Sequence, residues 1–547
     1  MRPFLALLLV ELLASGLVFN PPAAHEQSSP GTTTPITHLV VIFQENVSFD
    51  HYFATYPNAA NPQGQPQFTP LANTPGINGL SGALMTGNPN LNSANGTGAT
   101  NPFRLDRSQA ATNDQNHNYM PEQIAFHGGL MDLFPMSVGT AGPPPTAAAP
   151  LGTTPPFVTK GLTMGYYDGN TVTALWNYAQ RFAMSDNSYD TNFGPSTPGA
   201  LNLVSGQTNG VINNINGTGA VASDGTPTGL SDIGDADPAG DVCSTTTGET
   251  FSMSGQNIGN LLNAAGVTWG FFEGGFDLTV TNPNGTTGCA RSSTSTYVGS
   301  SKADYIPHHE PFQYYKSTAN LTHARPTSVT NIGYTDAANH QYDIHDFYDA
   351  VMAGNFPAVS FLKAPGYQDG HAGYSTPLDE QQFIVTVINF LQQQSGDWAH
   401  TAVAIAWDDS DGWYDHQMGP IVNQSTGPSD ALSGTGACGS GTNTALPGVA
   451  PGTTHAQSRC GYGPRQPLLV ISPYARQNYV DHTVTDLTSI IRFVEDNWLD
   501  GQRIGQGSFD GIANSIEGML SFTKPNHAKY ILNPTTGEVE GKAASTN

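Results

Sequence analysis

The sequence predicts an α/β sandwich built on a mostly parallel sheet. Short apolar runs rich in β-branched residues recur along the 547 residues, as is typical of strands buried on both faces. Segments with helical periodicity separate these runs. Strands and helices in alternation indicate a sheet that is covered by helices.

Five apolar runs are predicted as strands. The first, residues 39–43, reads Leu-Val-Val-Ile-Phe. The other four cover residues 267–272, 358–362, 402–407 and 468–472. Each is short enough for a strand and is too apolar to lie at the surface.

Four helices are predicted between these strands, over residues 175–182, 258–265, 377–394 and 487–498. The third has the clearest signals. Thr376 can cap it, Pro377 suits the first helical position, and Asp379 completes a pattern that resembles a capping box. Its apolar face consists of Phe383, Val387, Ile388 and Leu391.

Long stretches rich in Gly, Pro, Thr and Asn interrupt this pattern, at residues 57–100, 136–159, 208–248, 283–301 and 423–465. We interpret them as loop insertions into a single catalytic domain that spans residues 35–547, because strands and candidate site residues occur on both sides of each. The polar tail, residues 534–547, is expected to be poorly ordered.

Residues 1–24 have the pattern of an export signal. Arg2 precedes an apolar stretch from Phe4 to Leu13 that only Glu11 interrupts, and small residues follow as far as Ala24. The stretch is short for a membrane span, although an uncleaved anchor is the alternative interpretation. We therefore expect a periplasmic or extracellular protein without stable membrane insertion.

The four cysteines suit an oxidising compartment. Cys243, Cys289, Cys438 and Cys460 all lie in Gly/Ser/Thr-rich segments, and we expect sequence-near pairs, Cys243 with Cys289 and Cys438 with Cys460. Free thiols are the alternative, and no Cys-x-x-Cys zinc pattern is present.

The chain is strongly acidic, with 18 Lys and Arg against 43 Asp and Glu and a formal net charge of -25. This charge repels nucleic acid and anionic membranes, so a general polyanion-binding role is disfavoured. An anionic substrate can still bind where a cation, imidazoles and backbone amides outweigh the background charge.

Two pairs of polar residues directly follow predicted strands. Glu45 and Asn46 follow the first strand, and Asp408 and Asp409 follow the fourth. The carboxyl ends of parallel strands share one edge of a sheet, so the pairs are expected to meet there. Their oxygens suit a divalent cation, provided that the backbone turns so that both members of a pair face it. The alternative is that these acids cap helices or solvate loops.

Ser196 is the candidate nucleophile. It lies in Phe-Gly-Pro-Ser-Thr-Pro-Gly-Ala-Leu, where Pro195 and Pro198 restrain the backbone. The amino end of a helical segment over residues 199–205 is expected to present free amides to an anion. The same composition is also ordinary for a turn.

Sixteen histidines are many for a chain with so few other bases. Several lie in aromatic-rich loops: His117, His308, His309 and His371. A lone histidine is usually a hydrogen-bonded structural residue. We expect that role for His25, His400, His455 and His527.

Three segments carry a family resemblance: Val-Ile-Phe-Gln-Glu-Asn-Val-Ser-Phe-Asp-His (41–51), Gly-Pro-Ser-Thr-Pro-Gly (194–199) and Trp-Asp-Asp-Ser-Asp-Gly-Trp-Tyr-Asp-His (407–416). They resemble the bacterial phosphoesterase family that holds non-specific phospholipases C and respiratory-burst-inhibiting acid phosphatases. The likeness extends over about residues 35–500 in the same motif order. It implies an alkaline-phosphatase-like three-layer sandwich, with helices on both faces of the sheet.

The resemblance also implies roles for site residues. Glu45, Asn46, Asp408 and Asp409 would hold one divalent metal ion together with Ser196, the nucleophile, and Asp408 would take part in catalysis. His117, His308 and His371 would surround the phosphoryl group with Asn46, and His308 or His371 would protonate the leaving alcohol. His309, His345 and His416 are weaker candidates. The metal could be Mg²⁺, Ca²⁺, Mn²⁺ or iron.

The sequence departs from the phospholipase C branch, which commonly follows a threonine nucleophile with Pro-Asn-Arg. Here Thr-Pro-Gly-Ala follows Ser196, which favours the acid phosphatase branch. The many histidines and the few Lys and Arg in the motifs predict an optimum on the acid side of neutrality, because imidazoles must be charged to bind the phosphoryl dianion. Phospholipase C activity is the alternative, and sulfate esters or phosphodiesters are further possible substrates. The competing class is a non-catalytic surface-binding protein with a structural metal site.

Overall fold

The computed structural model describes residues 31–148, 154–423, 425, 427–432, 438 and 457–540. The predicted export signal, His25, His455 and most of the 423–465 insertion lie outside the described residues, as do the last residues of the tail. Among the described residues, no helix is both long and apolar enough to cross a membrane.

A nine-stranded sheet forms the centre of the molecule. Its order is β13 (Gln341–Asp343), β10 (Trp269–Glu273), β14 (Val359–Lys363), β1 (His38–Gln44), β15 (Thr401–Trp407), β16 (Arg465–Ile471), β4 (Ala183–Tyr189) and β17 (Tyr479–Asp481), with β18 (Thr485–Asp486) also beside β4. The five predicted strands are all present.

Most neighbours in this sheet are parallel, as predicted. Strands β13, β10, β14, β1 and β15 run in one direction. The exception is β16, the fifth predicted strand, which pairs antiparallel with both β15 and β4. Its carboxyl end therefore lies at the opposite edge of the sheet from the ends of β1 and β15.

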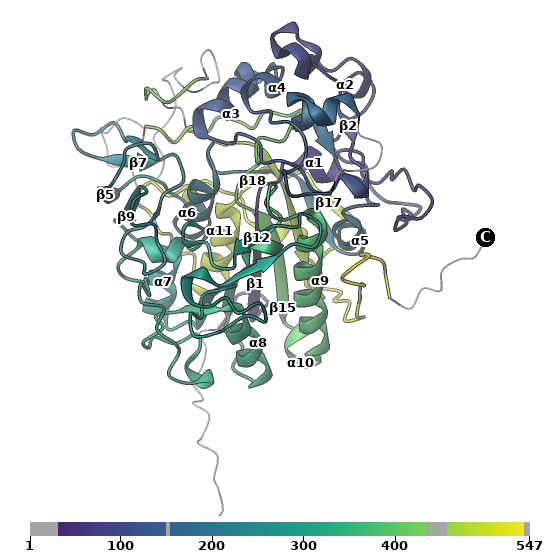
Figure 1. Ribbon diagram of the computed structural model, residues 1–547. Helices are drawn as coiled ribbons and strands as arrows, with labels where there is room; N and C mark the ends of the chain where they lie inside the picture. The colour runs from purple at the N-terminus through teal and green to yellow at the C-terminus, as the bar shows by residue number, and fades with distance from the viewer. Residues whose placement is uncertain are drawn as a thin grey trace, which may run out of the picture.

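Helices cover the sheet (Figure 1). The four predicted ones are α5 (Thr173–Arg181), α7 (Ile258–Ala265), α9 (Pro377–Gln393) and α11 (Thr488–Trp498). The others are α1 (Phe49–Phe53), α2 (Ala83–Thr86), α3 (Tyr119–Phe126), α4 (Phe134–Ser137), α6 (Ser196–Ser205), α8 (Ile344–Met352) and α10 (Ser395–Trp398). Helices α6, α7 and α11 pack together on one side, and α5 contacts α9 on the other. The result is the predicted three-layer α/β sandwich.

The start of α9 shows how the sequence directs local structure. Thr376 Oγ1 accepts a hydrogen bond from the Asp379 amide at 3.2 Å, and the same hydroxyl donates to the Asp379 carboxylate at 2.7 Å. The predicted cap is therefore present, although the Asp379 side chain bonds the Thr376 hydroxyl and not its backbone amide.

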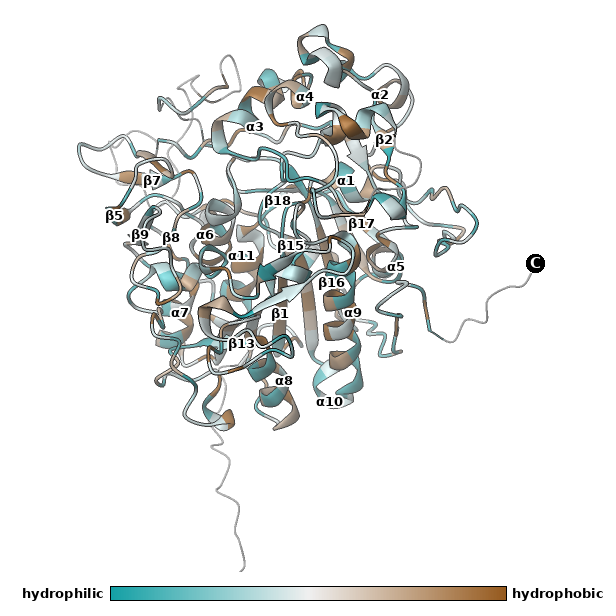
Figure 2. Cartoon of the chain, in the orientation of Figure 1, coloured by the Kyte–Doolittle hydropathy of each residue, from teal (hydrophilic) through white to brown (hydrophobic). Residues whose placement is uncertain are grey.

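The insertions carry small elements of their own. They include β5 (Val211–Ile215), β6 (Val221–Ser223), β7 (Leu230–Asp232), β8 (Asp237–Pro238), β9 (Thr250–Met253), β11 (Ser292–Thr294) and β12 (Ser301–Ala303), while β2 (Phe103–Arg104) pairs with β3 (Gly165–Tyr166). Figure 1 shows α2, α3, α4 and β2 gathered over one end of the central sheet. Figure 2 shows apolar residues concentrated in the sheet and its helices, and polar residues along the loops.

Both predicted disulfides are present. Cys243 bonds Cys289, with Cα atoms 5.2 Å apart, and Cys438 bonds Cys460, with Cα atoms 5.7 Å apart. Each bond closes a loop in one of the predicted insertions or between two of them.

Candidate active site

Strand register brings the two acidic pairs together. Gln44, the last residue of β1, pairs with Trp407, the last residue of β15, so the residues that follow are neighbours in space. The Asn46 amide donates to Asp408 Oδ1 at 3.0 Å. Ligand oxygens of Glu45, Asp408 and Asp409 all lie within 4.8 Å of one another.

The backbone turns at this edge of the sheet, as the shared site requires. Asn46 has a φ of 66° and Asp411 a φ of 53°, both in the left-handed region that asparagine and aspartate tolerate best after glycine. Asp411 Oδ1 accepts a 3.1 Å hydrogen bond from Asn46 Nδ2, which links the two turned loops. The turns allow adjacent side chains to face one point instead of opposite faces of the sheet.

Ser196 lies against these acids. Its Oγ is 2.9 Å from Glu45 Oε2 and 3.1 Å from Asp409 Oδ2, and the residue is only 2% exposed. Ser196 is the first residue of α6, so this helix begins three residues before the predicted segment 199–205. The first turn is also less open to an anion than predicted, because the Thr197 amide donates to Asp235 and Pro198 has no amide hydrogen.

Gly199 explains how α6 comes so close to the acidic loop. A Cβ atom at this position would lie 2.0 Å from the backbone oxygen of Asp408. Any other residue would push the helix and the loop apart, and Ser196 with it. The glycine in Pro-Ser-Thr-Pro-Gly therefore serves this packing contact.

Lys363 is a member of the site that the sequence analysis missed. It is the last residue of β14, it is fully buried, and its Nζ contacts Glu45 Oε1 and lies 4.0 Å from Asp408 Oδ2. Lys363 directly follows the predicted strand 358–362, at the sheet edge where the acidic pairs were expected. That position is the signal that could have identified it.

Burial makes the acids unusual. It raises the pKa of Glu45 well above its ordinary value, and the Asp408 charge adds to the effect. Burial likewise raises the pKa of Asp409, again with Asp408 beside it. Burial opposes ionisation of Asp408 too, but Lys363 and hydrogen bonds to this carboxylate outweigh it and lower its pKa.

Two oxygens here suit a cation. Asp408 Oδ2 and Asn46 Oδ1 are buried and accept no hydrogen bond from the described residues. Together with oxygens of Glu45, Asp409 and Ser196 they form a set of hard ligands, the kind that Mg²⁺, Ca²⁺ and Mn²⁺ prefer. The residues present therefore fit the implied metal ion.

The candidate histidines form two pairs. His117 and His371 have ring centroids 6.0 Å apart, and His308 and His309 have centroids 4.7 Å apart. His117 Nδ1 lies 3.2 Å from Asp411 Oδ1. Burial lowers the pKa of His117, but Asp409, Asp411 and Asp114 reverse the effect and raise it well above its ordinary value.

The other three histidines differ in their surroundings. Burial lowers the pKa of His371 to about 4, and its ring stacks on Tyr374 at 4.3 Å. His308 Nδ1 lies 3.3 Å from Asp237 Oδ1. His309, a weaker candidate in the sequence, has its Nδ1 3.3 Å from Glu45 Oε1. It is thus in direct contact with the acidic cluster.

The remaining weak candidates lie in separate ion-pair networks. His345 Nδ1 is 3.0 Å from Asp343 Oδ1, and His416 Nδ1 is 2.7 Å from Asp50 Oδ2. The two histidines contact neither Ser196 nor the acidic pairs. His400 bonds the Pro35 backbone oxygen, and His527 packs edge-on to Tyr474.

Glu122, on α3, is a second residue that the sequence analysis missed. It is 1% exposed, and its Oε2 accepts a hydrogen bond from the Gly194 amide at 3.0 Å. Its Oε1 accepts one from Ser410 Oγ at 2.6 Å. Burial raises its pKa to about 7. One side chain therefore links the loop before Ser196 to the loop after Asp409.

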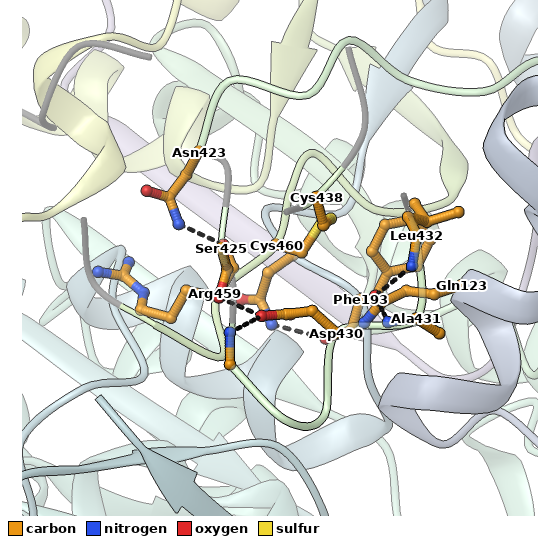
Figure 3. Close-up of a disulfide and its surroundings, with 12 residues drawn as sticks. Gln123, Phe193, Asn423, Ser425, Asp430, Ala431, Leu432, Cys438, Arg459 and Cys460 are labelled. Carbon is orange, nitrogen blue, oxygen red and sulfur yellow. Dashed lines mark hydrogen bonds between the residues drawn. A yellow bond between two sulfur atoms is a disulfide. The ribbon is translucent and has the colours of Figure 1, made fainter. Parts of the chain in front are cut away.

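The loop that precedes Ser196 also contacts the Cys438–Cys460 disulfide (Figure 3). The Phe193 amide, three residues before Ser196, donates to the Cys460 backbone oxygen at 3.1 Å. Gln123 Oε1, on α3, accepts from the amides of Ala431 at 2.8 Å and Leu432 at 3.4 Å. Helix α3 thus contacts the segment that precedes Cys438 and, through Glu122, the loop that precedes Ser196.

Comparisons with known proteins give a consistent result. A model of the phosphoesterase family matches residues 36–499. Curated relatives include a non-hemolytic phospholipase C from Pseudomonas aeruginosa, 23% identical over 94% of this chain and 61% of the relative. Another is phospholipase C A from Mycobacterium tuberculosis, 25% identical over 91% of this chain and 79% of the relative. This chain therefore spans less than two thirds of the Pseudomonas protein.

The similarity to solved structures is weak. A protein in the alkaline phosphatase superfamily from Vibrio parahaemolyticus is 11% identical, covers 77% of this chain and 78% of its own, and has a TM-score of 0.27. A phosphonate monoester hydrolase from Silicibacter pomeroyi has a TM-score of 0.28 at 11% identity, covering 66% of this chain and 73% of its own.

Proposed function

The chain belongs to the phosphoesterase family, and from that premise we propose that it hydrolyses phosphoric esters, as an acid phosphatase, through a phosphoserine at Ser196. The observation that carries the proposal is the position of Ser196 Oγ, 2.9 Å from Glu45 Oε2 and 3.1 Å from Asp409 Oδ2. A hydroxyl buried among carboxylates is a poor nucleophile by itself, so it needs an activating partner.

A divalent cation fits that requirement. Glu45, Asn46, Asp408, Asp409 and Ser196 would hold it, with the two unpartnered oxygens of Asn46 and Asp408 among its ligands. When bound, such a cation favours the ionised hydroxyl and neutralises charge on the phosphoryl oxygens.

Residues of the chain would carry the proton and the substrate. Glu45 Oε2 and Asp409 Oδ2 are the atoms placed to accept the Ser196 proton. The Ser196 Oγ–P bond then forms as the bond from phosphorus to the ester oxygen breaks, and His308 or His371 protonates that oxygen. Water next attacks the phosphoserine, which releases phosphate and restores the serine hydroxyl.

Two side chains would bind the phosphoryl oxygens. His117 keeps its positive charge because Asp409 and Asp411 raise its pKa, so it can contact the dianion. Asn46 Nδ2 uses one hydrogen for Asp411 Oδ1, which leaves the other for phosphate and Oδ1 for the cation. The low pKa of His371, about 4, supports an acid optimum, because this ring gains its proton only as the pH falls.

Phospholipase C activity is the second candidate. The similarity to phospholipases C favours it, and Met136 and Val158 in one insertion are 39% and 55% exposed. Ser-Thr-Pro-Gly at the nucleophile favours the phosphatase. We also propose that the protein is exported and that residues 35–547 form one catalytic domain, which agrees with two disulfides and a continuous central sheet.

One experiment separates these candidates. The purified protein is stripped of metal, reloaded in turn with Mg²⁺, Ca²⁺, Mn²⁺ or iron, and assayed on a monoester, a diester, a sulfate ester and phosphatidylcholine. We expect metal-dependent turnover that is fastest on the monoester below neutral pH. Fastest turnover of phosphatidylcholine would favour the phospholipase, and no turnover with any metal would favour a structural site.

A further inference from the structure

Lys302 lies next to the catalytic histidines. It is in β12, and its Nζ is 3.8 Å from the ring centroid of Tyr374. The same ring stacks on His371, with centroids 4.3 Å apart and planes at 22°. Tyr374 therefore contacts both the ammonium group and His371, and its hydroxyl donates to Asp369 Oδ2 at 3.1 Å.

The protein holds this lysine in place. Its stem passes over Gly366, where an added Cβ would lie 3.0 Å from Lys302 Cγ. The Gly366 amide donates to the Asp304 backbone oxygen, and β12 pairs with β11 through Lys302 and Ser293. The side chain is half-buried, so its position depends on packing and on the cation–π contact with Tyr374.

Lys302 has no carboxylate within ion-pair distance, 4.0 Å, in the described part of the chain. Asp114, an acid beside the His117–His371 pair, is already paired with His117, since its Oδ1 lies 3.4 Å from His117 Nδ1. The positive charge at Lys302 is therefore available to a ligand.

We propose that Lys302 forms a subsite for a second anionic group in the alcohol portion of the substrate. His371 is placed to protonate the leaving oxygen, and Tyr374 contacts both His371 and the Lys302 ammonium group. The ammonium group therefore lies one ring away from the side chain that would meet the alcohol as it leaves. Esters whose alcohol carries a carboxylate or a second phosphate are preferred, and choline esters are disfavoured. This inference rests on the proposed function.

The test compares two esters with one skeleton. Glycerol 3-phosphate and 3-phosphoglycerate differ in a hydroxymethyl group and a carboxylate. In the wild type we expect kcat/KM to favour 3-phosphoglycerate. Lys302→Gln should reduce that preference about tenfold, mainly through KM, since charge pairs at binding sites commonly contribute about this much. Lys302→Arg should retain most of the preference.

Lys316→Gln, at an exposed position, is the matched control and should leave the ratio unchanged. Equal losses on both esters in Lys302→Gln, or no loss, would overturn the proposal. Binding of both esters to Ser196→Ala and to Ser196→Ala/Lys302→Gln, measured by calorimetry, tests the subsite without turnover. If Ser196 is not the nucleophile, Ser196→Ala retains turnover. If Lys302 forms no subsite, Ser196→Ala and Ser196→Ala/Lys302→Gln bind the two esters with the same preference.

Discussion

The two carboxylate oxygens of Glu45 contact different side chains, a lysine and a serine, and this arrangement is the central feature of the site. Lys363 contacts one carboxylate oxygen and Ser196 contacts the other, 2.9 Å away. The buried lysine thus compensates charge and orients the acid toward the hydroxyl. Loss of Lys363 would leave only His309, 3.3 Å away, beside Glu45 Oε1, and loss of the Ser196 hydroxyl would remove the partner of Oε2. Both changes are costly for a fully buried carboxylate.

Gly199→Ala tests the contact between α6 and the acidic loop. The new Cβ would lie 2.0 Å from the Asp408 backbone oxygen, so helix and loop must separate. We expect kcat to fall at least about tenfold, because displacements of about 1 Å at a reacting group have large effects. Stability should fall by about 1–3 kcal/mol, as is typical of overpacking.

Gly396→Ala is the control for this change. No atom lies within 4 Å of a Cβ at Gly396, and its φ is not in the left-handed region. This variant should retain both activity and stability. Wild-type kcat in Gly199→Ala would contradict the packing argument.

At the level of residues, the sequence identified those that share a motif. Glu45, Asn46, Asp408 and Asp409 follow strands, and Ser196 lies between prolines, so each carries a local signal in the sequence. Lys363 also follows a strand but was missed, because a single lysine does not indicate its partner Glu45, 318 residues away. Glu122 carries no such signal, and its partner Gly194 is 72 residues away. His309 was ranked below His308 because spacing does not tell which of two adjacent rings faces the cluster.

At the scale of elements, α3 connects three parts of the site. His117 lies just before it, Glu122 bonds the two loops that carry Ser196 and Asp409, and Gln123 bonds Ala431 in the segment that precedes Cys438. The helix is only eight residues long, so its position depends on these tertiary bonds.

Glu122→Gln tests this connection. The amide cannot accept from both Gly194 and Ser410 in the same way, because one of its two ends is a donor. We expect stability to fall by about 1–3 kcal/mol and kcat to fall about tenfold or more. Glu495→Gln, at a buried glutamate on α11 that bonds Arg503 and Ile504, should lose stability with kcat retained. Equal kcat values in the two variants would contradict a positioning role for Glu122.

Elements were predictable where the apolar pattern was strong. The helix at Ile258–Ala265 and the strand that ends at Trp407 match their predicted bounds closely. Strand β4 was missed because it reads Ala-Met-Ser-Asp-Asn-Ser-Tyr, and its polar side chains are buried by partners that only the fold supplies. The direction of β16 was not predictable either, because an apolar run carries no information on which way it pairs.

At the scale of the whole molecule, buried acids should make stability depend on pH. Burial raises the pKa of Glu380 to about 8 and that of Asp486 to about 7. In the unfolded chain such groups titrate near pH 4. The folded state therefore holds protons that the unfolded state has released, and stability is lost as the pH rises toward these folded-state pKa values.

The test uses the window between pH 6.5 and 8. Other groups also titrate here: histidines with lowered pKa values, such as His371 at about 4, lose their remaining protons in the unfolded state, which adds stability as the pH rises. The contribution of Glu380 is therefore the difference in slope between the wild type and Glu380→Gln. We expect the free energy of unfolding to fall by roughly 2 kcal/mol across this window from Glu380. Glu380→Gln should flatten the slope in chemical denaturation series. An unchanged slope would show that Glu380 is ionised in the folded protein.

The most direct test of the account is to capture phosphate on Ser196. The protein is mixed with excess monoester at acid pH, quenched within its first turnover in strong acid, and digested for mass spectrometry. We expect a phosphorylated peptide that contains Ser196 in the wild type, and neither this peptide nor turnover in Ser196→Ala. Turnover in Ser196→Ala within about tenfold of the wild type, or phosphate captured at another residue, would contradict it.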